Sequence, residues 1–240
     1  MDDQLNGAVV VVAGASSGLG LATATAARDA GAQVVLVARD RERLDAARDS
    51  VGGDARAFAL DVVDAGAVED LFAALGHVDH VASFTGEQPV APVADTTHEL
   101  YQRALDARVW AARNLCASAA PRMGERGSFT FCSGVSAWRP RPNRAAGAAA
   151  TAALESFARG MAVELAPRRV NSVCPGAFDT PVLDRAFGAD KQAALAPYLS
   201  TLPLGRLGHP AELAHAVIFL MSNDYVTGTV LHVDGGALLI

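Results

Sequence analysis

Short runs of β-branched and other apolar residues alternate along the 240-residue chain with longer Ala- and Leu-rich segments of helical spacing. The runs are apolar on both sides, which is typical of strands in a parallel sheet that helices cover on both faces. The expected strands are 8–13, 33–38, 55–60, 79–84, 128–133, 169–174 and 229–234. The expected helices are 18–30, 40–49, 65–75, 96–120, 144–166 and 210–221, and they supply right-handed crossovers. This alternation predicts an α/β fold with a doubly wound parallel sheet in a three-layer sandwich.

The chain shows no sign of division into separate domains. No linker, repeat or low-complexity tract interrupts it, and 51% of its residues are hydrophobic while 19% are charged. We therefore expect residues 1–240 to form a single domain. Residues 176–205 are less regular than the rest, and we expect them to form a mobile flap that covers the substrate.

Composition excludes several classes of partner. The formal net charge of −6 is mild and dispersed, so we expect no nucleic acid as a partner and favour a small-molecule substrate. The first residues are acidic, lack a basic region and contain only a short apolar run, so we expect a cytoplasmic protein without a membrane segment. Cys116, Cys132 and Cys174 are widely spaced, which favours core positions over disulfides or zinc. The six histidines show no metal-ligand spacing, so we expect no metal site.

A glycine-rich stretch, AGASSGLG at 13–20, follows the first expected strand and opens the first expected helix. Gly14, Gly18 and Gly20 would allow a pyrophosphate to approach the backbone, and the free amides of the helix N-terminus would meet its charge. The alternative is a tight turn without a ligand. We predict a dinucleotide site of the Rossmann type, in which Ser16, Ser17 and Leu19 also contact the cofactor.

The end of the second strand bears on the choice of cofactor, because an acidic residue there accepts from the ribose 2′-hydroxyl and an arginine accommodates a 2′-phosphate. Ala38 stands where the acid is expected and Arg39 follows it, so the sequence favours NADPH. Asp40 is the rival acid, but its position before a helical run indicates an N-cap. Arg39 could equally be a solvated charge at the strand end. Asp61 and Val62, after the third strand, are placed to reach the adenine ring.

These segments together resemble the short-chain dehydrogenase/reductase family over nearly the whole chain. AGASSGLG is similar to the family's cofactor turn, Asp61-Val62 to its adenine contact, SFTG (83–86) to its Asn-Asn-Ala-Gly element and VTGTVLHVDGG (226–236) to its last strand. NSVCPGAFDTP (171–181) resembles the stretch that passes the nicotinamide, which implies cofactor contacts for Pro175, Gly176 and Thr180. The resemblance also implies a homodimer or homotetramer built on helices 96–120 and 144–166.

The family's catalytic tetrad of Asn, Ser, Tyr and Lys is largely missing. Aligned by element order, Arg108 stands at the asparagine position, Gly147 at the tyrosine position and Thr151 at the lysine position. The serine position falls on Gly134, and Ser133 immediately before it would restore the serine after a shift of one residue. In the family the lysine lies one helical turn from the tyrosine and lowers its pKa.

A second observation is independent of that alignment. The tyrosines are Tyr101, Tyr198 and Tyr225, and four residues after them stand Leu105, Leu202 and Thr229. The one lysine, Lys191, lies in the expected flap. The Tyr-x-x-x-Lys pair is therefore absent in every register.

Loss of a general acid lowers the rate roughly 10²–10⁴-fold. Another group must therefore donate the proton, or the substrate must need little acid catalysis. We expect Ser133, Tyr198 or a water held by Thr151 to act here, with Ser136 as a further candidate. An iminium ion becomes a neutral amine on receiving hydride, so an imine-like acceptor would tolerate the loss better than a ketone. The alternatives are a lyase, cyclase or isomerase on the same fold, or an oligomerising partner without catalysis.

Two further features concern the substrate. Glycine within a helix costs about 1 kcal/mol relative to alanine, so Gly147 indicates either an enlarged pocket or close packing at a subunit interface. Arg139, Arg141 and Arg144 lie close together before this helix, and with Arg108 they could clamp an anionic substrate. The alternative for this run is a solvated loop.

Overall fold

The computed structural model describes residues 4–240, and at position 189 the backbone alone. Its centre is a seven-stranded sheet in the order β3-β2-β1-β4-β5-β6-β7, and every neighbouring pair is parallel. The strands are β1 (Val9–Ala13), β2 (Gln33–Ala38), β3 (Arg56–Ala59), β4 (Val78–Ser83), β5 (Met123–Cys132), β6 (Arg169–Pro175) and β7 (Val230–Val233). The predicted doubly wound parallel sheet is confirmed, and the strand order reverses between β1 and β4.

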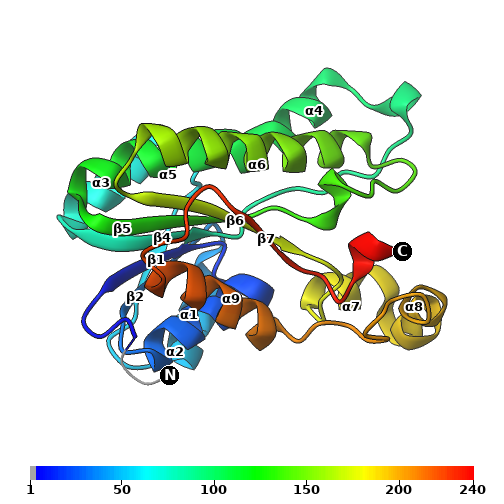
Figure 1. Cartoon of the computed structure of the whole chain (residues 1–240), viewed down its shortest axis with the longest axis horizontal. Coiled ribbons are helices and arrows are strands. Elements are labelled where there is room, and N and C mark those ends of the chain that lie inside the picture. The colour runs from blue at the N-terminus through cyan, green and yellow to red at the C-terminus, as the bar shows by residue number, and fades with distance from the viewer. Residues whose placement is uncertain (1–3) are drawn as a thin grey trace.

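Helices cover both faces of the sheet (Figure 1). They are α1 (Gly18–Asp29), α2 (Arg41–Val51), α3 (Ala65–Leu75), α4 (His98–Leu105), α5 (Ala111–Ala119), α6 (Ala145–Glu164), α7 (Pro181–Phe187), α8 (Lys191–Leu199) and α9 (Pro210–Ser222). One buried core joins the sheet to α3, α5 and α6, and a second joins it to α1, α2 and α9. Alternate residues of β1 enter the two cores, since Val11 faces the first while Val10 and Val12 face the second.

The helix predicted at 96–120 runs through α4 and α5, but its winding changes between them. A π-helical turn, Asp106–Trp110, separates α4 from α5. A π turn places one extra residue in the helix and shifts the direction of the side chains on it. Arg108 is thereby buried against the sheet although its neighbour Trp110 is half exposed.

The segment 176–205 is more regular than expected. It folds into α7 and α8 with a short 3₁₀ turn between them, beside the sheet and near the C-terminus (Figure 1). Lys191 at the start of α8 donates to Asp179 and Asp184, which ties the segment together. Its function as a flap remains a prediction.

The three cysteines are buried and unpaired with one another, which confirms their position in the core. Burial raises the pKa of Cys132 to about 11 and that of Cys174 to about 12. Within residues 4–240 no helix combines the length and the apolar character that crossing a bilayer requires. The same residues contain no group of three His, Cys, Asp or Glu side chains that could hold a metal ion.

Candidate active site

The turn between β1 and α1 has the close backbone contacts that its glycines predict. Gly14 has a φ of +77°, and a Cβ on it would lie 3.0 Å from the carbonyl carbon of Phe84 at the end of β4. A Cβ on Gly20 would lie 2.2 Å from Gly14 O, so the third glycine allows the helix to pack on the turn. The N-cap of α1, Ser17, makes no side-chain cap bond, and the first turn holds no acidic residue. An uncapped helix N-terminus of this kind suits an anionic group.

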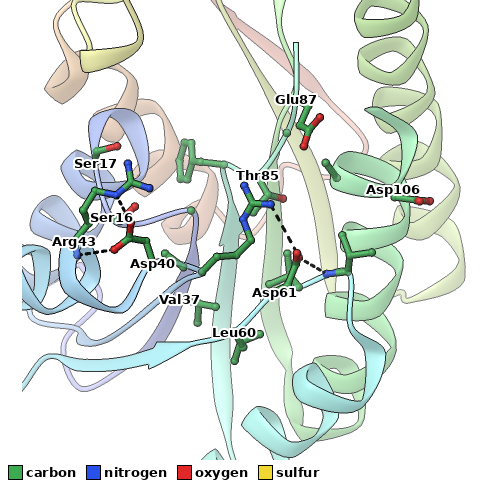
Figure 2. A pocket seen from close by; sticks show the side chains of 18 of the residues that line it. Ser16, Ser17, Val37, Asp40, Arg43, Leu60, Asp61, Thr85, Glu87 and Asp106 are labelled. Atoms are coloured by element: carbon green, nitrogen blue, oxygen red, sulfur yellow. Dashed lines mark hydrogen bonds and ion pairs between the residues drawn. The ribbon is translucent and has the colours of Figure 1, made fainter. Parts of the chain in front are cut away.

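A cavity of about 470 Å³ opens beside this turn at the carboxyl ends of β1 to β4. Six of the residues predicted to bind the cofactor line it, namely Gly14, Ser16, Ser17, Arg39, Asp61 and Val62. Figure 2 shows Ser16, Ser17, Asp40 and Arg43 on one side and Asp61 and Thr85 on another. Glu87 and Asp106 mark the end of the cavity near the π turn. Size, position and the free helix N-terminus fit a dinucleotide.

The carboxylate of Asp40 caps α2, as the sequence predicts. Oδ1 accepts from the backbone amide of Arg43 at 3.0 Å and Oδ2 accepts from Arg43 Nε at 2.9 Å. The amide hydrogen bond of Arg43 is the main cause of the lowered pKa of Asp40. Both oxygens are therefore engaged within α2. Arg39 is 72% exposed, and its Nη1 lies 3.8 Å from Asp61 Oδ2 across the cavity mouth.

A buried asparagine that the sequence analysis did not identify fixes the wall opposite Arg39. Asn114 on α5 donates through Nδ2 to Val62 O at 3.1 Å and to Val63 O at 3.0 Å. Asp61 Oδ1 accepts from the amide of Val63 at 3.0 Å. These bonds hold the turn after β3 that lines the cavity. The signal in the sequence was a polar residue on the apolar face of an expected helix.

The positions aligned with the serine, lysine and tyrosine do come together, but without the expected groups. A Cβ on Gly134 would lie 3.9 Å from Thr151 Cγ2. Thr151 is buried and donates to Gly147 O at 2.6 Å, while it accepts from Ser136 Oγ at 3.3 Å. Gly147 faces the loop after β4, where a Cβ would lie 2.9 Å from Gln88 Oε1. Gly147 therefore packs against a side chain of its own chain, while the enlarged pocket and the interface packing expected there stay predictions.

Ser133 lies in a buried hydrogen-bonded group whose carboxylate the sequence analysis missed. Its hydroxyl donates to Glu155 Oε1 at 2.8 Å, and Val173 O lies 3.1 Å from Ser133 Oγ. Glu155 on α6 is only 3% exposed and also accepts from Trp138 Nε1 at 3.1 Å. Glu155 follows Thr151 by one helical turn, so an acidic residue on the buried stripe of an Ala-rich helix was the available signal.

The remaining predicted residues lie outside the lining of the large cavity. The ring of Tyr198 on α8 stacks with the guanidinium of Arg141, whose Cζ is 4.5 Å from the ring centroid. Thr180 lies beside the glycine turn, since a Cβ on Gly18 would be 3.5 Å from Thr180 Cγ2. Pro175 ends β6, and a Cβ on the following Gly176 would lie 2.7 Å from Asp234 O.

Comparison with known proteins gives matches over nearly the full length. Residues 14–237 match the family model described as enoyl-(acyl carrier protein) reductase. An uncharacterised oxidoreductase of Methylorubrum extorquens is 35% identical over 97% of this chain and 98% of its own. The L-sorbose reductase of Gluconobacter frateurii, solved with NADPH and L-sorbose, is 29% identical with a TM-score of 0.92 over 100% of both chains. A short-chain oxidoreductase of Pseudomonas aeruginosa PAO1, described as containing an atypical catalytic center, is 32% identical with a TM-score of 0.90 over 98% of both chains.

Proposed function

Because the chain belongs to the short-chain dehydrogenase/reductase family of oxidoreductases, we propose that it is an NADP(H)-dependent reductase with an atypical active site. Its substrate is a small molecule with an imine-like or carbonyl carbon. The observation that carries this proposal is the contrast between the two ends of the site. The cofactor turn is intact and lines a cavity, while glycine and threonine stand at the tyrosine and lysine positions.

The preference for NADP(H) is supported by the charges at the end of β2. Ala38 offers no carboxylate there, and Asp40 uses both oxygens within α2. Among the residues that the structure describes, Arg39 at the cavity mouth makes one ion-pair contact, a long one to Asp61 at 3.8 Å. Arg39 is therefore available to form charge-assisted hydrogen bonds to a 2′-phosphate. Gly14, Ser16, Ser17, Gly18, Leu19 and Gly20 would hold the pyrophosphate, Asp61 and Val62 the adenosine, and Pro175, Gly176 and Thr180 the nicotinamide end.

The bound nicotinamide would supply the hydride, and the chain's own residues would orient the acceptor and handle the proton. We assign proton handling to Ser133, Thr151 and Tyr198. Their hydroxyls differ in surroundings, since Ser133 donates to buried Glu155, Thr151 donates to its own helix, and Tyr198 stacks on Arg141. The chain's one lysine, Lys191, pairs with Asp179 and Asp184. In the described residues no lysine is therefore engaged with any of these three hydroxyls to lower its pKa.

Weak acids at the site favour an acceptor that needs little acid catalysis. A ketone gains an alkoxide on hydride addition, whereas an iminium carbon gives a neutral amine. A tyrosine that acts as general acid lowers the activation barrier of ketone reduction by roughly 3–5 kcal/mol. An iminium substrate does not need this contribution. We therefore propose a cyclic or conjugated imine as the preferred substrate class.

The experiment measures steady-state oxidation of NADPH by the purified protein with matched cyclic imines and ketones. The proposal predicts turnover of imines and kcat/KM values for the matched ketones at least 100-fold lower. Ketone reduction at ordinary enzyme rates would contradict it. Binding of NADPH without consumption by either class would favour a lyase, cyclase or isomerase.

Family relatives commonly oligomerise, and we propose a cytoplasmic homodimer or homotetramer here. The outer surface of the helices around the π turn and of α6 carries exposed apolar side chains, Trp110 at 50% and Val163 at 81% exposure. Such side chains favour a protein contact over solvent. Light scattering coupled to size-exclusion chromatography tests this, with a monomer of 24.7 kDa as the contradicting result.

A further inference from the structure

Arg108 is a buried cation at the carboxyl end of the sheet. The π turn Asp106–Trp110 directs it inward, so that only 6% of the residue is exposed. Its guanidinium lies against Gly86, where a Cβ would be 2.7 Å from Cζ and 3.0 Å from Nη2. Gly86, Asp106 and Ala107 line the large cavity, so the guanidinium lies directly behind its wall.

One edge of this guanidinium has no partner. Nη1 donates to Cys132 O at 3.2 Å, at the end of β5. Nε is buried without a hydrogen bond, and Nη2 donates to no group in residues 4–240. Nε is enclosed by the protein, so Nη2 is the donor of this edge that a carboxylate can reach, through a charge-assisted hydrogen bond.

No described carboxylate balances the charge. No Asp or Glu oxygen among residues 4–188 and 190–240 lies within 4.0 Å of Arg108, whereas the other buried arginine, Arg169, lies 4.0 Å from Asp224. Burial lowers the pKa of Arg108, which reports the unfavourable environment of the cation. A buried charge without a counterion is strongly unfavourable, and an apolar side chain would fill the same space without that cost. The arginine therefore indicates an anion that arrives with a ligand.

The position of Arg108 relative to the sheet indicates that this ligand is the substrate and not the cofactor. Its two contacts, Gly86 after β4 and Cys132 at the end of β5, lie at the edge where ligands bind in doubly wound sheets. Cys132 directly precedes Ser133 and Gly134, the strand end that faces Thr151. The cofactor turn and Arg39 lie at the other side of the cavity, after β1 and β2.

We propose that Arg108 binds a carboxylate of the substrate through Nη2, so that the enzyme selects anionic imines or carbonyl compounds. This inference rests on the proposed function for the identity of the reaction, but not for the binding itself. Arg108 acts as a specificity-determining residue, and Gly86 is the glycine that leaves room for its guanidinium.

The test is calorimetric titration with three pairs of probes: acetate and acetamide, pyruvate and pyruvamide, and pyrrole-2-carboxylate and pyrrole-2-carboxamide. Each pair is titrated into the cofactor-free protein and into its NADP⁺ complex, in which no reduction occurs. We expect at least one carboxylate to bind tenfold or more tightly than its amide. Equal affinity within all three pairs in both forms would overturn the proposal. Failure of NADP⁺ to bind would contradict the proposed cofactor and leave the cofactor-free titrations as the test of Arg108.

Two variants and one control assign the effect to Arg108. Arg108→Met should reduce the carboxylate preference to less than threefold, and Gly86→Ala should weaken it by displacing the guanidinium. Arg113→Met, an exposed arginine of α5, should keep the full preference. A preference that survives in Arg108→Met would overturn the proposal.

The thermal stability of the ligand-free variant provides a readout that does not involve ligand. In the empty fold Arg108 makes one hydrogen bond, to Cys132 O, and the cost of burying its charge opposes that gain, so Arg108→Met should melt at about the same temperature as the wild type or higher. A melting temperature lowered by several degrees would show that Arg108 supports the fold, and this result would also overturn the proposal.

Discussion

The side chain of Gln88 occupies the space over Gly147, where a Cβ would lie only 2.9 Å from Gln88 Oε1. The neighbouring Pro89 Cδ would lie 3.6 Å from the same Cβ. The loop after β4 therefore packs on α6 where the family's alignment expects a tyrosine. In this arrangement the end of the Gln88 side chain occupies the place that a tyrosine at position 147 would need, so Gln88 would have to move to admit one.

Restoring the missing pair should require Gln88 to be shortened. We predict that Gly147→Tyr with Thr151→Lys in a Gln88→Ala background gains reduction of simple ketones with NADPH, at least 100-fold above the wild type. The same two substitutions with Gln88 intact should gain much less, because the amide occupies the space of the ring. Ketone reductase assays on the purified variants test this. Equal activity in both backgrounds would show that Gln88 does not block the position.

Arg39 should determine the cofactor preference. Removal of a charge-assisted contact costs roughly 1.5–3 kcal/mol, so Arg39→Ala should weaken NADPH binding about 10- to 100-fold and leave NADH binding nearly unchanged. Arg41→Ala is the matched control, because Arg41 is an exposed arginine two residues away that does not line the cavity. Fluorescence titrations of both cofactors measure the effect. A similar loss for NADH and NADPH would assign Arg39 a general electrostatic role.

The two buried arginines should respond oppositely to removal of charge. Arg169 donates to Met221 O at 2.6 Å and also to Leu220 O, and it thereby satisfies the last carbonyl groups of α9. Arg169→Met leaves these acceptors buried and unpaired, so we predict a loss of roughly 3 kcal/mol in the free energy of unfolding. Arg108→Met should show no such loss. Denaturant unfolding of the two variants makes the comparison, and destabilisation of both by similar amounts would contradict it.

Buried His80 should make the fold sensitive to acid. It is 7% exposed and hydrogen-bonded to Ser128, and burial lowers its pKa from 6.5 to about 4. Because the unfolded chain takes up the proton first, this stability is fully present above pH 6.5 and is lost as the pH falls toward 4. The loss is on the order of 3 kcal/mol.

Unfolding experiments across this range test the role of His80. The difference in stability between the wild type and His80→Asn should shrink as the pH falls. The exposed His215→Asn is the control and should follow the wild type. Parallel profiles for wild type and His80→Asn would contradict the assignment.

The sequence was sufficient for the features that depend on local pattern. The strands, the glycine turn and the cap at Asp40 are each defined by residues close together in the chain, and the structure confirms them. The absence of the Tyr-x-x-x-Lys pair could also be established from the sequence, because the pair is defined by a spacing within one helix. Arg108 was found by alignment, although its burial was not.

The other site features join distant residues, and no local pattern contains them. Gln88 meets Gly147 across 59 positions, and Glu155 accepts from Ser133 across 22. The π turn that buries Arg108 is a small change in helix winding. The Ala- and Leu-rich sequence of 96–120 contains no glycine or proline that would mark its position. Such features follow from packing on the sheet and become visible only in three dimensions.

The central claim is that the cofactor site has been kept for hydride transfer while the tyrosine and lysine have been lost. Its most direct test is incubation of the protein with NADPH deuterated at the transferred position and a matched cyclic imine and ketone, followed by mass spectrometry of the products. The account predicts one deuterium in the amine and almost none in the alcohol. Rapid labelling of the alcohol, or no label in either product, would contradict it.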